Sequence, residues 1–176
     1  AGAARSGLRR QALRNPLYLP PVLTPNGALL TAQTAQVDLG GGQFSSALTS
    51  NGLFPGPTFR ARRNDTVSVQ LQNGLADPTT IHWHGMVVPH LADGHPLQAV
   101  AAGGSYSYQF PLIQRAATNW YHPHPHMLTA KEVHLGLAGF FLVEDDEEAA
   151  LGLPSGAYEI PLLLRDASLD VNGQLQ

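Results

Sequence analysis

Short segments in which apolar and polar residues alternate recur along the chain and predict β-strands. Residues 66–73 give the clearest case. There the apolar side chains of Val67, Val69 and Leu71 alternate with serine and glutamine. Because successive side chains of a strand point to opposite faces, this segment predicts a strand with one buried face. By alternation, by continuous apolar runs and by flanking turn residues, further strands are predicted at 35–39, 58–63, 79–84, 105–110, 119–124, 137–143 and 160–164.

Turn-forming residues separate these segments, and helical patterns are scarce. The chain has 18 glycines and 14 prolines, and only 13% of its residues are charged, about half of the roughly 25% usual in soluble domains. Only residues 144–148, which are mostly acidic, predict a short helical turn. Many short strands joined by Gly, Pro and Asn turns predict an all-β fold, an antiparallel sandwich or barrel.

The chain of 176 residues is long enough for one domain with a substantial core. Residues 1–33 are expected to form an extended N-terminal arm, because 15–33 are rich in proline and leucine. The domain itself is expected over residues 34–170. Residues 171–176 contain an Asn-Gly turn signal with nothing after it to pair, so we expect them to be the start of a truncated linker to a missing domain.

Charge and composition narrow the function classes. The formal net charge is -3, which gives no sign of a nucleic-acid partner. No apolar run approaches the roughly 20 residues that cross a bilayer, so no membrane span is expected. With no cysteine, the chain offers neither disulfides nor a thiolate ligand. Four arginines among the first fourteen residues fit the basic flank of an export signal, an anion-binding arm or a flexible tail.

Two histidine pairs with the same spacing carry the candidate chemistry. His82 and His84 flank Trp83, and His122 and His124 flank a proline. Residues i and i+2 of a strand share one face, so each pair projects together. If the pairs face each other, four imidazoles surround one small volume. Imidazole suits copper, zinc, iron and nickel, and the pattern therefore predicts a polynuclear, imidazole-rich metal site.

These clusters and their neighbours resemble the first cupredoxin domain of the multicopper oxidases, the family that includes laccases and bacterial cuprous oxidases. The resemblance covers roughly residues 35 to 176 and implies a cupredoxin-like Greek-key β-sandwich. The motifs that carry it are His82-Trp83-His84-Gly85, Asp93-Gly94, Trp120-Tyr121-His122-Pro123-His124 and Gly136-Leu137-Ala138-Gly139, preceded by Leu53-Phe54-Pro55-Gly56-Pro57-Thr58 and Arg63-Asn64-Asp65-Thr66-Val67.

The resemblance implies a role for each matched residue. His82 binds the type 2 copper of a trinuclear cluster, His84 and His122 bind one copper of the type 3 pair, and His124 binds the other. Asp93 matches a carboxylate near the type 2 copper that helps to deliver protons, although an ordinary Asp-Gly turn is the alternative. The family's type 1 copper needs a thiolate and two imidazoles, which must come from outside this chain.

The remaining histidines and the two tryptophans are expected to play other parts. In the resembling pattern His126 does not bind metal directly, and we expect it either to support the metal ligands or to be structural. His90, His95 and His134 stand alone near turns and are expected at the surface. Trp83 and Trp120 are expected in the core, where an indole wall can also hold imidazole rotamers.

The function implied is that of the amino-terminal domain of a multicopper oxidase. Dioxygen is reduced to water while a phenol-like, amine-like or metal-ion reductant is oxidised. Further cupredoxin domains or another chain complete the cluster, and the location is periplasmic or secreted. Two alternatives stay open. One is a non-enzymatic cupredoxin-like copper-binding module, and the other is a binuclear zinc hydrolase that uses H-x-H motifs.

Overall fold

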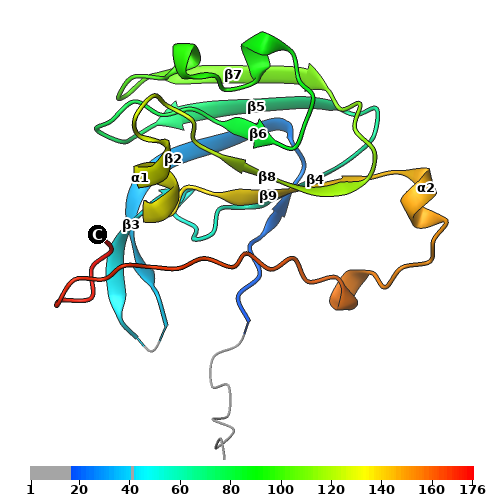
Figure 1. Ribbon diagram of the computed structural model, residues 1–176. Helices are drawn as coiled ribbons and strands as arrows, with labels where there is room; N and C mark the ends of the chain where they lie inside the picture. The colour runs from blue at the N-terminus through cyan, green and yellow to red at the C-terminus, as the bar shows by residue number, and fades with distance from the viewer. Residues whose placement is uncertain (1–16, 41) are drawn as a thin grey trace, which may run out of the picture.

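Nine strands form two β-sheets in the computed structural model, which describes residues 17–40 and 42–176 (Figure 1). One sheet has the strand order β1 (Val22–Leu23), β4 (Thr58–Arg62), β9 (Gly139–Glu144), β8 (Ala117–His122) and β6 (His82–His84). The other has the order β3 (Phe44–Ser50), β2 (Asn26–Asp38), β5 (Thr66–Asn73) and β7 (Ser105–Pro111). The predicted all-β sandwich is confirmed.

Aromatic side chains fill the space between the sheets. Trp83 of β6 is completely buried, and its ring centroid lies 5.7 Å from that of Tyr108 and 5.8 Å from that of Phe141. Large aromatic side chains bury the most apolar area per residue, so this cluster contributes strongly to stability. Because Trp83 points inward, its two neighbours on β6 point outward. The core therefore fixes the direction in which His82 and His84 project.

The prediction of a strand at 160–164 is wrong. These residues are extended but belong to neither sheet, and Leu162 and Leu164 are 63% and 92% exposed. In Figure 1 this orange-to-red segment runs outside both sheets. It is held by side chains instead: Arg60 pairs with Glu159 (2.9 Å), and the Arg165 guanidinium lies 4.6 Å from the centre of the Phe54 ring. An apolar run of strand length does not reveal whether a sheet edge is available to pair with it.

The ends of the described chain differ from the expected organisation. Strand β2 begins at Asn26 and pairs in parallel with β5, so the boundary expected at residue 33 falls inside a strand of the sandwich. Residues 1–16 of the expected arm, with their four arginines, lie outside the described residues. At the other end, Leu169 pairs with Leu175, and the backbone N–H of Leu175 donates to the Ser45 hydroxyl (2.9 Å). The last residues thus contact β3.

Short helices occupy the connections. Helix α1 (Thr129–Leu135) lies between β8 and β9, and α2 (Asp146–Ala149) follows β9, where a short helical turn was predicted. Asp145 caps α2 by accepting a hydrogen bond from the Glu148 backbone N–H (2.8 Å). Among the described residues, no helix has the length and apolar character needed to cross a bilayer.

Candidate metal centre

The pairing of β6 with β8 brings the two histidine motifs side by side. The two strands run antiparallel, with His82 opposite His122 and His84 opposite Trp120. Directly opposed residues on one face of an antiparallel pair lie close enough for their side chains to touch. His82, His84 and His122 therefore share one corner of the sheet, as the i, i+2 spacing predicts.

The four predicted ligands converge on one open pocket of about 590 Å³. One nitrogen from each of His82, His84 and His122 lies within 4.8 Å of the other two. His124 follows β8, and its ring centroid is 5.4 Å from that of His82 and 6.2 Å from that of His122. Its backbone N–H donates to the Thr80 hydroxyl (2.7 Å). Three imidazoles thus form a tight group, and His124 lies beside it.

Backbone carbonyls determine which ring nitrogen of two histidines is free. His82 Nδ1 lies 2.8 Å from the Asp93 carbonyl oxygen, and His122 Nδ1 lies 2.8 Å from the Pro123 carbonyl oxygen. A carbonyl oxygen only accepts, so each Nδ1 carries the hydrogen and each Nε2 keeps a lone pair. Both rings are therefore prepared to bind a metal through Nε2.

His84 faces His122 directly. Its Nδ1 lies 3.1 Å from His122 Nε2, and since that Nε2 has no hydrogen in the neutral ring, His84 Nδ1 is the donor. A metal ion that replaces this hydrogen meets a lone pair from each ring. Burial lowers the pKa of His122 to about 4, with further lowering from its histidine neighbours and an opposing effect of the Pro123 bond. His122 is thus neutral at pH 7, as a metal ligand must be.

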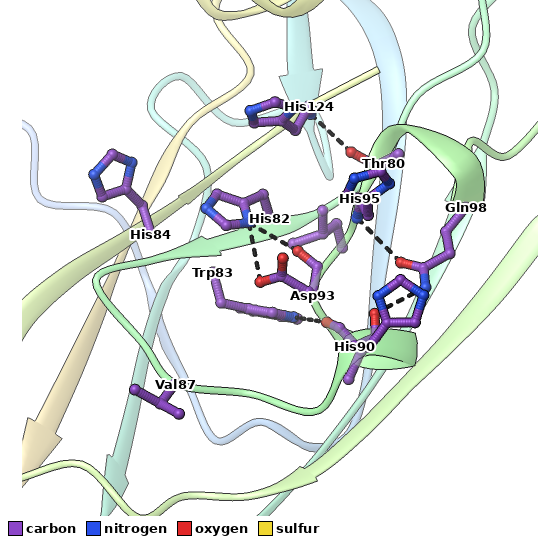
Figure 2. A network of polar contacts seen from close by, with 12 residues as sticks. Thr80, His82, Trp83, His84, Val87, His90, Asp93, His95, Gln98 and His124 are labelled. Atoms are coloured by element: carbon purple, nitrogen blue, oxygen red, sulfur yellow. Dashed lines mark hydrogen bonds and ion pairs between the residues drawn. The ribbon is translucent and has the colours of Figure 1, made fainter. Parts of the chain in front are cut away.

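Asp93 approaches the same corner from the loop after β6. Its carboxylate Oδ1 lies 3.4 Å from His82 Nδ1. Figure 2 shows His82 with Asp93 on one side and the rings of His84 and His124 on the other. The close approach depends on Gly94, which has a φ of +73° and whose added Cβ would lie 1.8 Å from the Ile81 carbonyl oxygen. Only glycine allows the loop to pack against β6 in this way.

Trp120 forms an aromatic wall beside the ligands. Its ring stacks on His84 with centroids 5.0 Å apart and lies 4.2 Å from the ring of His122. Trp83 is in the core as predicted, whereas Trp120 is half-buried on the outer face. Trp120 therefore restricts the ring orientations of His84 and His122.

Two polar residues of α1 were not anticipated as part of this region. His134, expected at the surface, lines the same pocket, and its Nε2 is buried with no hydrogen-bond partner among the described residues. Glu132, on the same helix, is fully buried and accepts a hydrogen bond from the Thr79 hydroxyl (2.7 Å). The sequence gives a signal for neither, because the helix that places them was not predicted. His90, His95 and His126 are exposed, as expected for the first two.

Comparison with known proteins identifies the family. A family model described as "Multicopper oxidase" matches residues 31–148, more than half of the chain. The chain belongs to the multicopper oxidase family. The multicopper oxidase mco of Staphylococcus aureus is 37% identical over 160 residues, which are 87% of this chain and 36% of that protein. The cell division protein FtsP of Photorhabdus laumondii is 35% identical over 159 residues, 88% of this chain and 34% of that protein.

The fold agrees with solved structures of this family. A laccase from Pediococcus acidilactici superposes with a TM-score of 0.84 at 34% identity, covering 92% of this chain and 37% of that one. The predicted cupredoxin-like Greek-key β-sandwich is therefore confirmed. This multicopper oxidase chain spans little more than a third of the length of each of these relatives.

Copper fits the donors that the chain provides. The site offers imidazole nitrogens with lone pairs directed at a shared volume, and imidazole is a favoured ligand of copper. The sequence contains no cysteine, so no thiolate competes in this set. His82, His84, His122 and His124 are the residues that would hold the metal, and bound copper would supply one-electron redox chemistry at this corner of the domain.

Proposed function

We propose that this chain supplies half of a trinuclear copper cluster, at which dioxygen is reduced to water while a phenolic, amine or metal-ion substrate is oxidised. The observation that carries the proposal is the convergence of three imidazole nitrogens within 4.8 Å of one another on a multicopper oxidase domain. The other ligands and the type 1 copper would come from further cupredoxin domains or another chain. An exported location, periplasmic or secreted, belongs to the same proposal.

The roles of the histidines follow the family pattern. His82 would bind the type 2 copper, and His124 would bind one copper of the type 3 pair. His84 and His122 would bind the other type 3 copper together. The separation of 3.1 Å between His84 Nδ1 and His122 Nε2 supports this last assignment, because an ion that replaces the hydrogen of His84 Nδ1 would meet one lone pair from each ring.

Asp93 would deliver the protons that oxygen reduction consumes. Its carboxylate lies at the edge of the cluster, 3.4 Å from His82 Nδ1, and it is half-buried and so in reach of solvent. A carboxylate in such a position can take a proton from water and pass it toward the reacting oxygen. The backbone of the same residue holds the His82 ring.

The two alternatives differ from this proposal in metal and in activity. A binuclear zinc hydrolase expects a carboxylate ligand and usually a parallel α/β frame, and the all-imidazole group on a β-sandwich disfavours it. A non-enzymatic copper-binding module is the second candidate function, and the similarity to a protein named for cell division keeps it relevant.

Metal analysis and oxygen uptake of the longer protein that carries this chain test the proposal. We expect copper and cyanide-sensitive oxygen consumption with a phenolic, amine or metal-ion reductant. Zinc at about two per chain with hydrolytic activity would support the hydrolase instead. Copper without oxygen uptake would support the non-enzymatic module.

Replacing Asp93 by asparagine is expected to slow oxygen reduction about 100-fold, within the 10²–10⁴-fold range typical of a lost acid–base group. The copper content should stay unchanged, because the Asp93 carbonyl that binds His82 is part of the backbone. Steady-state oxygen uptake and copper analysis on the same samples measure both. Asp166→Asn, which alters another carboxylate at the same pocket, is the control, and an equal loss in both variants would contradict the assigned role.

A further inference from the structure

The loop that carries Asp93 is held by a series of hydrogen bonds to its backbone carbonyls. The carbonyl oxygens of four successive residues each accept a hydrogen bond from a side chain elsewhere in the chain. The donors and distances are Gln98 Nε2 to His90 (2.8 Å), Tyr106 Oη to Leu91 (2.6 Å), Trp83 Nε1 to Ala92 (2.9 Å) and His82 Nδ1 to Asp93 (2.8 Å). Figure 2 shows the bonds of Gln98, Trp83 and His82. We name residues 90–93 the carbonyl ladder.

The two ends of the carbonyl ladder have different consequences. At one end, the Asp93 carbonyl keeps the hydrogen of His82 on Nδ1 and leaves Nε2 for a metal. At the other end, Tyr106 of β7 and Gln98 of the loop hold the first two carbonyls. If the first half of the ladder shifts, the Asp93 carbonyl moves away from His82, and the ring loses the acceptor that selects its tautomer.

We propose that Tyr106 and Gln98 are positioning residues, which fix the carbonyl ladder so that His82 presents Nε2 to the metal and the Asp93 carboxylate stays beside it. This inference rests on the proposed function, but its first step, the tautomer of His82, concerns the metal-free protein. Neither residue lies in the histidine motifs or in Asp93-Gly94.

The contacts of these two residues show that positioning can be separated from folding. The Tyr106 ring packs against Tyr108 with centroids 4.9 Å apart, a contact that phenylalanine keeps. Gln98 is half-buried at the surface, and its Oε1 also accepts from the His95 backbone N–H (3.0 Å). Tyr106→Phe and Gln98→Leu therefore remove the ladder donors without opening the core between the sheets.

The test uses the 176-residue chain, free of metal and labelled with ¹⁵N. Imidazole ¹⁵N spectra at pH 8 report where the hydrogen of His82 resides. We expect wild type to show one tautomer, with the hydrogen on Nδ1, and Tyr106→Phe, Gln98→Leu and the double variant to show a growing fraction of the other. Competition titration with Cu²⁺ should give about a tenfold weaker affinity in the double variant, at the low end of the effect of groups that orient metal ligands.

Two substitutions serve as matched controls. Gln72→Leu removes a comparable bond from a glutamine side chain to a loop carbonyl, that of Gly103 (3.0 Å). Tyr158→Phe removes the hydroxyl of an exposed tyrosine. Both should keep the His82 tautomer and the wild-type Cu²⁺ affinity.

An unchanged His82 tautomer in folded Gln98→Leu and Tyr106→Phe would overturn the inference, as would equal changes in the controls. Because Gln98 is at the surface, its variant decides the question even if Tyr106→Phe lowers the stability. A wild-type chain that takes up no Cu²⁺ would count against the proposed function, whereas a tautomer shift in the metal-free variants would still support the positioning role.

Discussion

Replacing His84 or His122 by alanine is expected to abolish oxygen reduction by the longer protein and to leave any blue type 1 colour unchanged. Each substitution removes one of the three nitrogens that lie within 4.8 Å of one another. The copper they would share loses a ligand, whereas a type 1 copper would take its thiolate ligand from outside this chain, which has no cysteine. Oxygen uptake, copper content and the visible absorption of each variant are the measurements.

His126→Ala is the matched control for these substitutions. His126 lies on the same loop as His124 but is exposed and outside the tight group of imidazoles, so its removal should change oxygen uptake by less than about twofold, as expected for a surface substitution. His122 is buried and its loss can lower stability, but His84 is exposed, so His84→Ala tests the ligand without that complication. Retained turnover in folded His84→Ala would exclude the ligand assignment.

The sequence predicts the histidine pairs well because their geometry is local. Residues i and i+2 of any strand share a face, and Trp83 between the first pair fixes the buried side. Periodicity does not show that β6 and β8 are neighbours, with His82 opposite His122, but the family resemblance assigns all four histidines to one cluster. The site could therefore be placed before its strand pairing was known.

Features that depend on distant contacts could not be predicted. The carbonyl ladder needs Tyr106 of β7 beside residues 90–93. The alternation of residues 105–110 does not indicate which acceptor the Tyr106 hydroxyl contacts. Helix α1 is only seven residues long and has no clear amphipathic pattern, so neither His134 nor Glu132 could be assigned to the site. The prediction of a strand at 160–164 failed for the same reason, because the sequence of a single segment does not show which strand it could pair with.

The second large expected effect concerns the stability of the folded protein and depends on the buried carboxyl of Glu132. Burial raises the pKa of its carboxyl from an ordinary 4.5 to about 7, the Thr79 hydrogen bond opposes this shift, and the nearby Asp77 adds to it. One carboxyl oxygen, Oε1, has no hydrogen-bond partner among the described residues. The folded protein thus holds this proton more tightly than the unfolded chain does.

The sign of the pH dependence follows from this difference. Below pH 4.5 the carboxyl is protonated in both states and contributes no pH dependence. Between pH 4.5 and about 7 only the unfolded chain releases the proton, so stability falls as the pH rises, and above pH 7 the loss is complete. At 1.36 kcal/mol per unit of pKa, the total is about 3 kcal/mol.

Glu132→Gln should remove this loss, because glutamine has the shape of the protonated carboxyl and does not titrate. We expect the difference in unfolding free energy between variant and wild type to grow in favour of the variant by about 3 kcal/mol from pH 4 to pH 8. Urea unfolding at several pH values measures it, and Glu148→Gln on α2, which is only half-buried, is the control. If the curves of wild type and Glu132→Gln run parallel, the carboxyl of Glu132 has the same pKa in the folded protein as in the unfolded chain, and its ionised form must then be stabilised by a cation or water that reaches Oε1.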